Sequence, residues 1–133
     1  MNRLDFTASE GNAFMRRYII EFGMGTDFHG QDVTRAAVKA VKDALSHSCL
    51  CGLEEVLEVK NLKEEIHIHV TVAVSDPEAV DAAAVVKALP MGTVDVKAVM
   101  GGLHTSGLYV PKFGDADDNI EAALACVEVE ICQ

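Results

Sequence analysis

The chain has 133 residues, a length that fits one domain and suffices to bury a single core without disulfides or structural metals. Its formal net charge of −10, with no basic cluster, argues against nucleic acid and anionic membranes as partners. The hydrophobic fraction is 50% and the mean hydropathy is +0.19, which is high for a small two-layer protein. We therefore predict a homo-oligomer, a trimer or a multiple of it, that hides apolar surface between its subunits.

The first 15 residues have neither the apolar core of a signal peptide nor the Arg and Ser bias of a transit peptide. We predict that residues 1–15 form a flexible extension and residues 16–133 a single domain of a cytoplasmic protein. The longest apolar stretch, residues 66–74, contains two histidines and a threonine and is too short to cross a membrane. Four cysteines without a secretory signal indicate free thiols or metal ligands rather than disulfides.

A strand is predicted over residues 17–22, which are β-branched and aromatic, and a glycine-rich loop follows it. Gly23 and Gly25 mark the place where the strand should end, because glycine permits sharp turns. The loop continues through Asp27 and His29 to Gly30. We interpret it as a strand-to-helix corner whose glycines let a ligand approach the backbone.

An amphipathic helix is predicted over residues 31–46, because apolar residues recur there at three- and four-residue spacing. Its apolar face contains Val33, Ala37, Ala40, Val41, Ala44 and Leu45, and its polar face contains Arg35, Lys39, Lys42 and Asp43. The apolar face should pack on a sheet. The unpaired N–H groups and positive dipole end of the first turn, with Arg35 one turn later, predict an anion site beside the loop.

Three more strands are predicted, over residues 66–74, 93–99 and 125–131, from alternation of apolar and polar side chains. The first of them is the clearest strand in the sequence. The segment 55–59 before it fits either a short edge strand or a further helical turn.

A second helix is predicted over residues 79–89. Ser75 and Glu78 form a capping box before it, and Pro90 ends it. Residues 109–119 are rich in Pro, Gly and Asp, and we interpret them as a connection.

The order strand, helix, strand, helix, strand, strand predicts an α+β fold of two layers, with two helices on one face of a largely antiparallel sheet. If residues 55–59 are a strand, the alternative is a ferredoxin-like fold with one strand appended. Both folds leave one sheet face without helices, and this open face carries Glu21, His67, His69, Lys97, Glu128 and Glu130. The face is either solvated or forms a ring interior or a ligand groove.

The loop carries the pattern G-x-G-x-D-x-H-G, formed here by Gly23, Gly25, Asp27, His29 and Gly30. In this it resembles a small family of uncharacterised bacterial and plant proteins that has no established activity. The resemblance extends from about residue 17 to residue 131, through the stretches 47–52 and 101–107. It implies that the loop matters and implies no particular chemistry.

The predicted order of elements is also similar to that of trimeric chorismate mutases of the Bacillus type and of RidA-like imine deaminases. In those proteins the sheets join around a threefold axis and the sites lie between subunits. This is a likeness of topology and not of sequence motif.

Asp27 and His29 are the strongest catalytic candidates, because a carboxylate near an imidazole can orient it for proton transfer. The structural alternative is that Asp27 caps a turn and His29 bonds a carbonyl. His104 follows in a second glycine-rich loop, where Gly101 and Gly102 either offer backbone N–H groups to an anion or are ordinary turn residues.

His47, Cys49 and Cys51 form an H-x-C-x-C cluster of soft ligands. Structural zinc sites favour C-x₂₋₄-C spacing and need four ligands, so we predict buried free thiols and no metal. His67 and His69 lie at i and i+2 of one strand, a spacing that holds a metal in some proteins and faces solvent or an interface in most.

The sequence thus favours an enzyme that acts on a small anionic or carbonyl-containing metabolite by proton transfer at a site between subunits. Asp27 and His29 would be the acid/base pair, and Gly25 and Gly30 would shape the pocket. No cofactor is predicted, because the three glycines are too widely spaced for a nucleotide fingerprint. The alternative is a non-catalytic ligand-binding or assembly protein.

Overall fold

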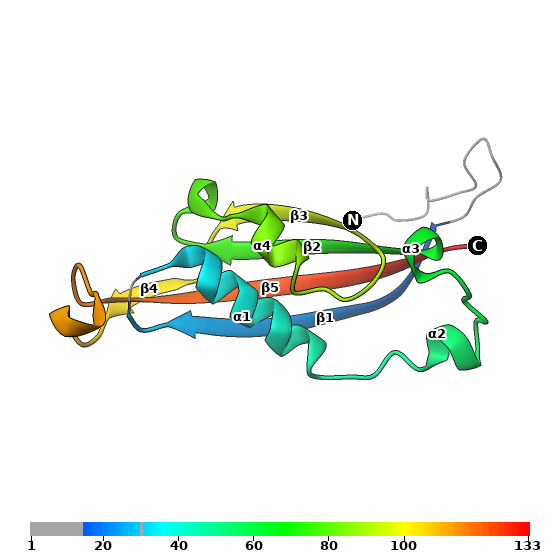
Figure 1. Ribbon diagram of the computed structural model, residues 1–133, viewed down its shortest axis with the longest axis horizontal. Helices are drawn as coiled ribbons and strands as arrows, with labels where there is room; N and C mark the ends of the chain where they lie inside the picture. Colours follow the sequence, from blue (N-terminus) through cyan, green and yellow to red (C-terminus); the bar gives the residue numbers. More distant parts are fainter. Residues whose placement is uncertain (1–14, 30) are drawn as a thin grey trace.

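A two-layer α+β architecture is seen in the computed structural model, which describes residues 15–29 and 31–133 (Figure 1). The predicted extension lies outside the described residues except for Met15, and so does Gly30. The elements are β1 (Met15–Asp27), α1 (Val33–Leu45), α2 (Gly52–Glu55), α3 (Leu62–Glu65), β2 (Ile66–Val74), the 3₁₀ turn η1 (Pro77–Ala79), α4 (Ala82–Val86), β3 (Thr93–Met100), β4 (Leu103–Ser106), the 3₁₀ turn η2 (Pro111–Phe113) and β5 (Asn119–Cys132).

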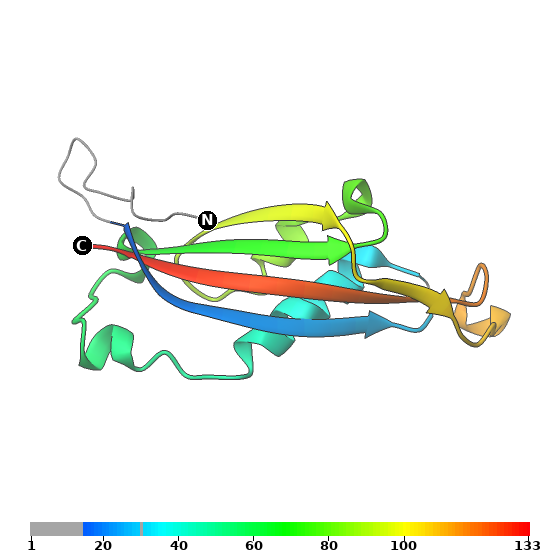
Figure 2. The same cartoon turned by 180° about the vertical axis from the view of Figure 1, so that it is seen from behind.

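The sheet is built around β5, which pairs with three other strands of the described chain. The order is β1-β5-β2-β3, and the short β4 pairs with the far end of β5. All pairs are antiparallel except β2 with β3. The helices lie on one face, and the opposite face is open when the molecule is seen from behind (Figure 2). The predicted fold class is confirmed, and β4 is the strand that the sequence did not indicate.

The core lies between α1 and alternate residues of β2 and β5. Ile66, Ile68, Val70, Val72 and Val74 of β2 are all buried, which confirms the predicted alternation residue by residue. On β5 the buried partners are Ala123, Ala125, Val127, Val129 and Ile131. The apolar face of α1 lies mainly over β1 and β5 and reaches β2. None of the helices in the described residues is long and apolar enough to span a membrane.

Gly23 and Gly25 do not end the first strand, and the prediction of a loop over residues 23–30 is wrong there. β1 continues to Asp27, and both glycines face α1. A Cβ on Gly23 would lie 2.2 Å from the carbonyl oxygen of Ala40, and one on Gly25 would lie 2.4 Å from the amide nitrogen of Ala40. The glycines therefore serve close packing of helix on strand, and a side chain at either position would collide with the helix backbone.

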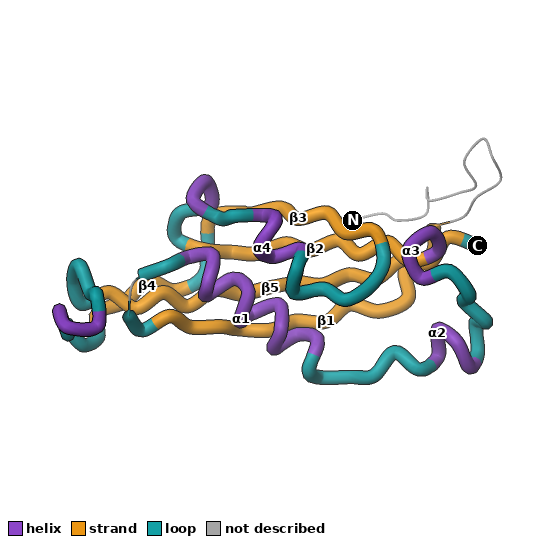
Figure 3. The backbone as a smooth tube through the Cα atoms, in the orientation of Figure 1, coloured by secondary structure: helices purple, strands orange, loops and turns teal. Residues whose placement is uncertain are grey.

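The second predicted helix is shorter than the sequence indicated. Instead of residues 79–89, the chain forms η1 and then α4, whose N-terminus is capped by Asp81 through bonds from Ala83 and Ala84. Ser75 does not cap a helix, because its amide and hydroxyl both donate to buried Glu121. The connection from α1 to β2 runs along one end of the sheet and contains α2 and α3 (Figure 3). The segment 55–59 is not a strand.

Substitution of Gly25 by alanine tests the close contact. We expect Gly25→Ala to lower the free energy of unfolding by about 2–3 kcal/mol, because the new methyl group overlaps the backbone of α1. Urea denaturation followed by circular dichroism measures the change.

Gly114→Ala is the matched control for this substitution. Gly114 has φ +91° and no neighbouring heavy atom within 4 Å of an added Cβ. Its replacement should cost about 1 kcal/mol from the left-handed backbone alone. Equal costs at the two positions would show that Gly25 is not needed for packing.

Candidate functional site

An aspartate and histidine pair forms beyond the end of β1, where His29 meets Asp115 from the segment before β5. The Nδ1 atom of His29 lies 2.8 Å from Oδ2 and 3.0 Å from Oδ1 of Asp115. Asp115 is 6% exposed and also accepts the backbone N–H of Val110 at 2.8 Å. The edge of the Phe113 ring packs against the imidazole, with 5.1 Å between ring centroids. Both side chains of the pair are therefore held in place.

His29 also lines a cavity of about 210 Å³ together with Phe28, Gly107, Leu108 and Ile120. A carboxylate that accepts a hydrogen bond from Nδ1–H fixes the neutral imidazole in the tautomer whose Nε2 can accept a proton. Among the described residues, no hydrogen bond to Nε2 is formed. The pair thus provides an oriented proton acceptor beside an apolar cavity, which is the geometry of a general base.

Asp27 does not pair with His29, so the predicted partner of the histidine is wrong. Asp27 is 3% exposed, and its Oδ2 accepts the N–H of Asp32 at 2.9 Å. Asp32 in turn caps α1 by accepting the N–H groups of Thr34 and Arg35 at 2.9 and 3.2 Å. These amides are bonded to carboxylates of the chain itself, and an added anion would meet two negative charges. The predicted anion site at this helix start therefore does not fit the geometry.

The other residues predicted to bind a ligand are either exposed to solvent or held in backbone contacts of the fold. Arg35 is exposed on the solvent side of α1. Gly101 donates its N–H to Val74 at 2.9 Å, and Gly102 has φ +74° where the chain passes from β3 to β4. A Cβ on Gly102 would lie 2.3 Å from the carbonyl oxygen of Ala122. The two glycines make a tight crossing, and the amide of Gly101 is not available to a ligand.

His104 lies on β4 and is exposed. It is opposite Glu121 of β5, which is opposite Asp27 of β1 on its other side. The three residues form one row across the end of the sheet. Adjacent strands are about 4.8 Å apart, so His104 and Asp27 are separated by about 10 Å at the backbone. The predicted candidates are therefore near one another, but their side chains do not form one cluster.

The four cysteines are free. Cys49 and Cys51 are exposed, so the prediction of buried thiols is wrong for these two. His47 lies 3.5 Å from Asp43 through its Nε2 atom. In the described part of the chain, no group of three or more His, Cys, Asp or Glu side chains is placed to hold a metal ion.

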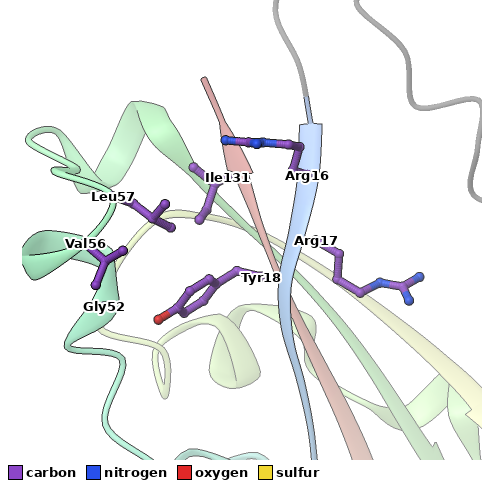
Figure 4. A pocket seen from close by; sticks show the side chains of 7 residues that line it. All are labelled: Arg16, Arg17, Tyr18, Gly52, Val56, Leu57 and Ile131. Carbon is purple, nitrogen blue, oxygen red and sulfur yellow. The ribbon is translucent and has the colours of Figure 1, made fainter.

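A second cavity, of about 320 Å³, lies at the opposite end of the sheet (Figure 4). Its lining includes Tyr18, Val56 and Leu57, and Tyr18 points toward Gly52 while Arg17 points away. A Cβ on Gly52 would lie 2.3 Å from the Tyr18 hydroxyl oxygen, so the glycine makes room for this ring. The sequence did not indicate this cavity, because Tyr18 is turned inward by a register shift of β1 between Arg17 and Ile19.

His69 is held between two carboxylates on the open face of the sheet. Its Nδ1 lies 2.6 Å from Asp95 on β3 and its Nε2 lies 2.7 Å from Glu130 on β5. Burial lowers the pKa of His69, but the hydrogen bonds to Glu130 and Asp95 raise it more, so the pKa lies above its ordinary value of 6.5. The histidine thereby joins three strands, a role consistent with the interpretation that it lies at a strand surface rather than a metal site.

The fold and this arrangement define an α+β protein with helices on one face of its sheet and an aspartate–histidine pair at one end. The chain belongs to the conserved hypothetical protein family Lin0512_fam, whose model matches residues 17–129. It is similar to the crystal structure of an FtsZ-like protein of unknown function from Nostoc punctiforme. The identity is 39%, the TM-score is 0.79, and the match covers 88% of this chain and 96% of that chain. No curated protein matches the chain.

The His69 contacts predict a pH-dependent contribution to stability. Because the folded pKa is raised, the contribution is fully present below the unfolded pKa of about 6.5 and is lost as the pH rises through the folded pKa. Wild type and His69→Gln should therefore differ most in unfolding free energy near pH 6, and the difference should shrink toward pH 9. Urea titrations across this range measure it. Thr71→Ala, on the same strand face, is the control, and a constant difference for His69→Gln would contradict the assignment.

Proposed function

We propose that the protein binds a small metabolite beside His29 and transfers a proton to or from it. The observation that supports this is the pairing of His29 with buried Asp115 next to a cavity of about 210 Å³. Asp115 positions the imidazole, and Nε2 takes or returns the proton. This keeps the reaction class expected from the sequence, which is isomerisation, elimination or hydrolysis, and replaces Asp27 by Asp115 as partner of the histidine.

The cavity walls indicate what kind of molecule would bind. Phe28, Leu108 and Ile120 offer apolar contacts, and His29 is the polar side chain of the lining. We therefore propose a compact ligand with an apolar body and a carbonyl group whose neighbouring C–H is acidic enough for an imidazole base.

The mouth of the cavity also supports the prediction of a site between subunits. Phe28 is 54%, Leu108 is 72% and Phe113 is 59% exposed, so large apolar side chains surround His29 at the surface. A second copy of the chain that covers them would exclude water from the imidazole and strengthen its interactions.

Deuterium exchange tests the proposed proton transfer. The wild-type protein is incubated in D₂O with a panel of small ketones, keto acids and aldehydes, and NMR follows the loss of proton signals next to the carbonyl. We expect exchange of at least one compound, reduced by 100-fold or more in His29→Gln, because general bases contribute about 10²–10⁴-fold. The glutamine keeps a donor for Asp115 and removes the base.

His104→Gln is the matched control, since it removes an exposed histidine at the same end of the sheet. Exchange that persists in His29→Gln would place the base elsewhere. If the wild type neither binds any compound of the panel nor exchanges its protons, the proposal is contradicted.

Assembly is the second candidate function, and an exposed apolar group on the open face supports it. The group consists of Ile20, Phe22, Met24, Leu103 and Leu124, which are between 40% and 69% exposed. The other half of the face carries the ionic contacts of His69, Glu130 and Arg17. Packing the apolar halves of three copies around a common axis would bury them while the charged halves stay in water.

Size exclusion with light scattering tests self-association. We expect a closed oligomer, most simply a trimer, at micromolar concentration in 0.15 M salt, where repulsion between chains of charge −10 is screened. Phe22→Glu should shift the mass to the 14.2 kDa monomer. Val56→Glu, at a residue that is 74% exposed on α2's C-terminal side, is the control. A monomeric wild type would contradict both the assembly and the shared site.

A further inference from the structure

Glu21 is a buried acid on the helix-facing side of β1, and neither the fold nor the His29 site accounts for it. It is 7% exposed. It lines a cavity of about 170 Å³ between the sheet, the end of α1 and the chain after α4. Ile68 and Val129 form the sheet wall of this cavity, and Leu45 and Met91 lie opposite.

The hydrogen bonding of Glu21 differs from that of the other buried acids. Its Oε1 accepts a hydrogen bond from the hydroxyl of Ser48. Within residues 15–29 and 31–133, no Lys, Arg or His side chain forms an ion pair with Glu21. In contrast, Asp27, Asp115 and Glu121 each accept a backbone N–H. Among the described residues, the partner of the Glu21 carboxyl group is thus one hydroxyl, and Glu21 lines the cavity.

A carboxylate in apolar surroundings is costly unless a cation or several donors satisfy it. The end of α1 does not lower this cost. Leu45, the last residue of α1, lines the same cavity, and the C-terminal end of a helix carries partial negative charge. The local potential is therefore negative on two counts, which favours a cation in the cavity.

We infer that this cavity binds a small organic cation, specifically a primary alkylammonium group attached to an apolar body. The ammonium donates to the carboxylate of Glu21 and to the hydroxyl oxygen of Ser48, and the alkyl part contacts Ile68, Val129 and Met91. At about 30 Å³ for each water-sized volume, 170 Å³ holds about five or six heavy atoms.

This site is separate from the one proposed around His29. Glu21 precedes His29 by eight residues, most of them in β1, and a strand rises about 3.3 Å per residue, so the two lie roughly 25 Å apart. The proposal of an alkylammonium site at Glu21 can therefore be tested independently of the proton-transfer proposal.

The experiment compares isobutylammonium with its neutral isostere isobutanol in 0.15 M sodium chloride. Binding is followed by amide chemical-shift changes in ¹⁵N-labelled protein. We expect saturable shifts with isobutylammonium at residues that line the cavity, such as Leu50 and Met91, and binding by isobutanol at least 10-fold weaker. Glu21→Gln should weaken isobutylammonium binding at least 10-fold, and Ser48→Ala by about 3- to 10-fold, as expected for charged and neutral hydrogen bonds.

Glu54→Gln is the matched control, because it removes one negative charge from an exposed position outside the cavity. It should bind isobutylammonium as the wild type does. Equal binding of the amine and the alcohol, or undiminished binding by Glu21→Gln, would overturn the inference. So would shifts spread over the acidic surface, or no saturable binding by any alkylammonium ion from methyl to pentyl. If Glu21→Gln does not fold, Ser48→Ala and the wild-type shift map decide the question.

Discussion

The close contact between α1 and β1 determines where the rest of the structure can lie. Gly23 and Gly25 present bare backbone to the helix. Ala36, Ala40 and Ala44 of α1 pack against them. Small residues on both elements let the two backbones approach, which brings the apolar face of α1 onto β1 and β5. The contact also sets the position of the end of α1 relative to the strand. Ala44 lies over Gly23, so Glu21, the next helix-facing residue of the strand, lies beyond the helix and beside a cavity instead of under a packed turn.

Strand alternation was the feature that the sequence predicted best. Residues 66–74 are the same in prediction and structure because one face of β2 is fully buried, and burial imposes strict alternation. The glycines of β1 have a different role from the one that the sequence indicates, and the reason is local. Glycine ends many strands, but here it permits close packing, and the two roles differ only in what lies opposite. The alanines at positions 36, 40 and 44 were a signal for the second role, since a row of small residues four apart matches glycines two apart on a strand.

The site could be predicted only in part, because its contacts are distant in sequence. His29 was identified from the loop pattern, but its partner Asp115 is 86 residues away and is brought to it by the segment before β5. Asp27 was closer in sequence and chemically equivalent, and nothing in the sequence distinguishes the two. His69 shows the same limit, since Asp95 and Glu130 become its neighbours only through the register of three strands. Residue types indicated the chemistry, whereas topology decided the partners.

Two acidic side chains on β1 have different roles because they lie near opposite ends of one helix. Asp27 and Glu21 both lie on the helix-facing side of β1, and the glycine pair lies between them. Asp27 lies at the N-terminal end, where it bonds the amide of the capping residue Asp32 and where the helix dipole favours negative charge. Glu21 lies at the C-terminal end, where the dipole opposes negative charge and the nearest partner is one serine hydroxyl. Asp27 therefore stabilises the helix start. Glu21 opposes the local field and is mostly buried, so its presence is better explained by a cation that it can hold than by a contribution to folding.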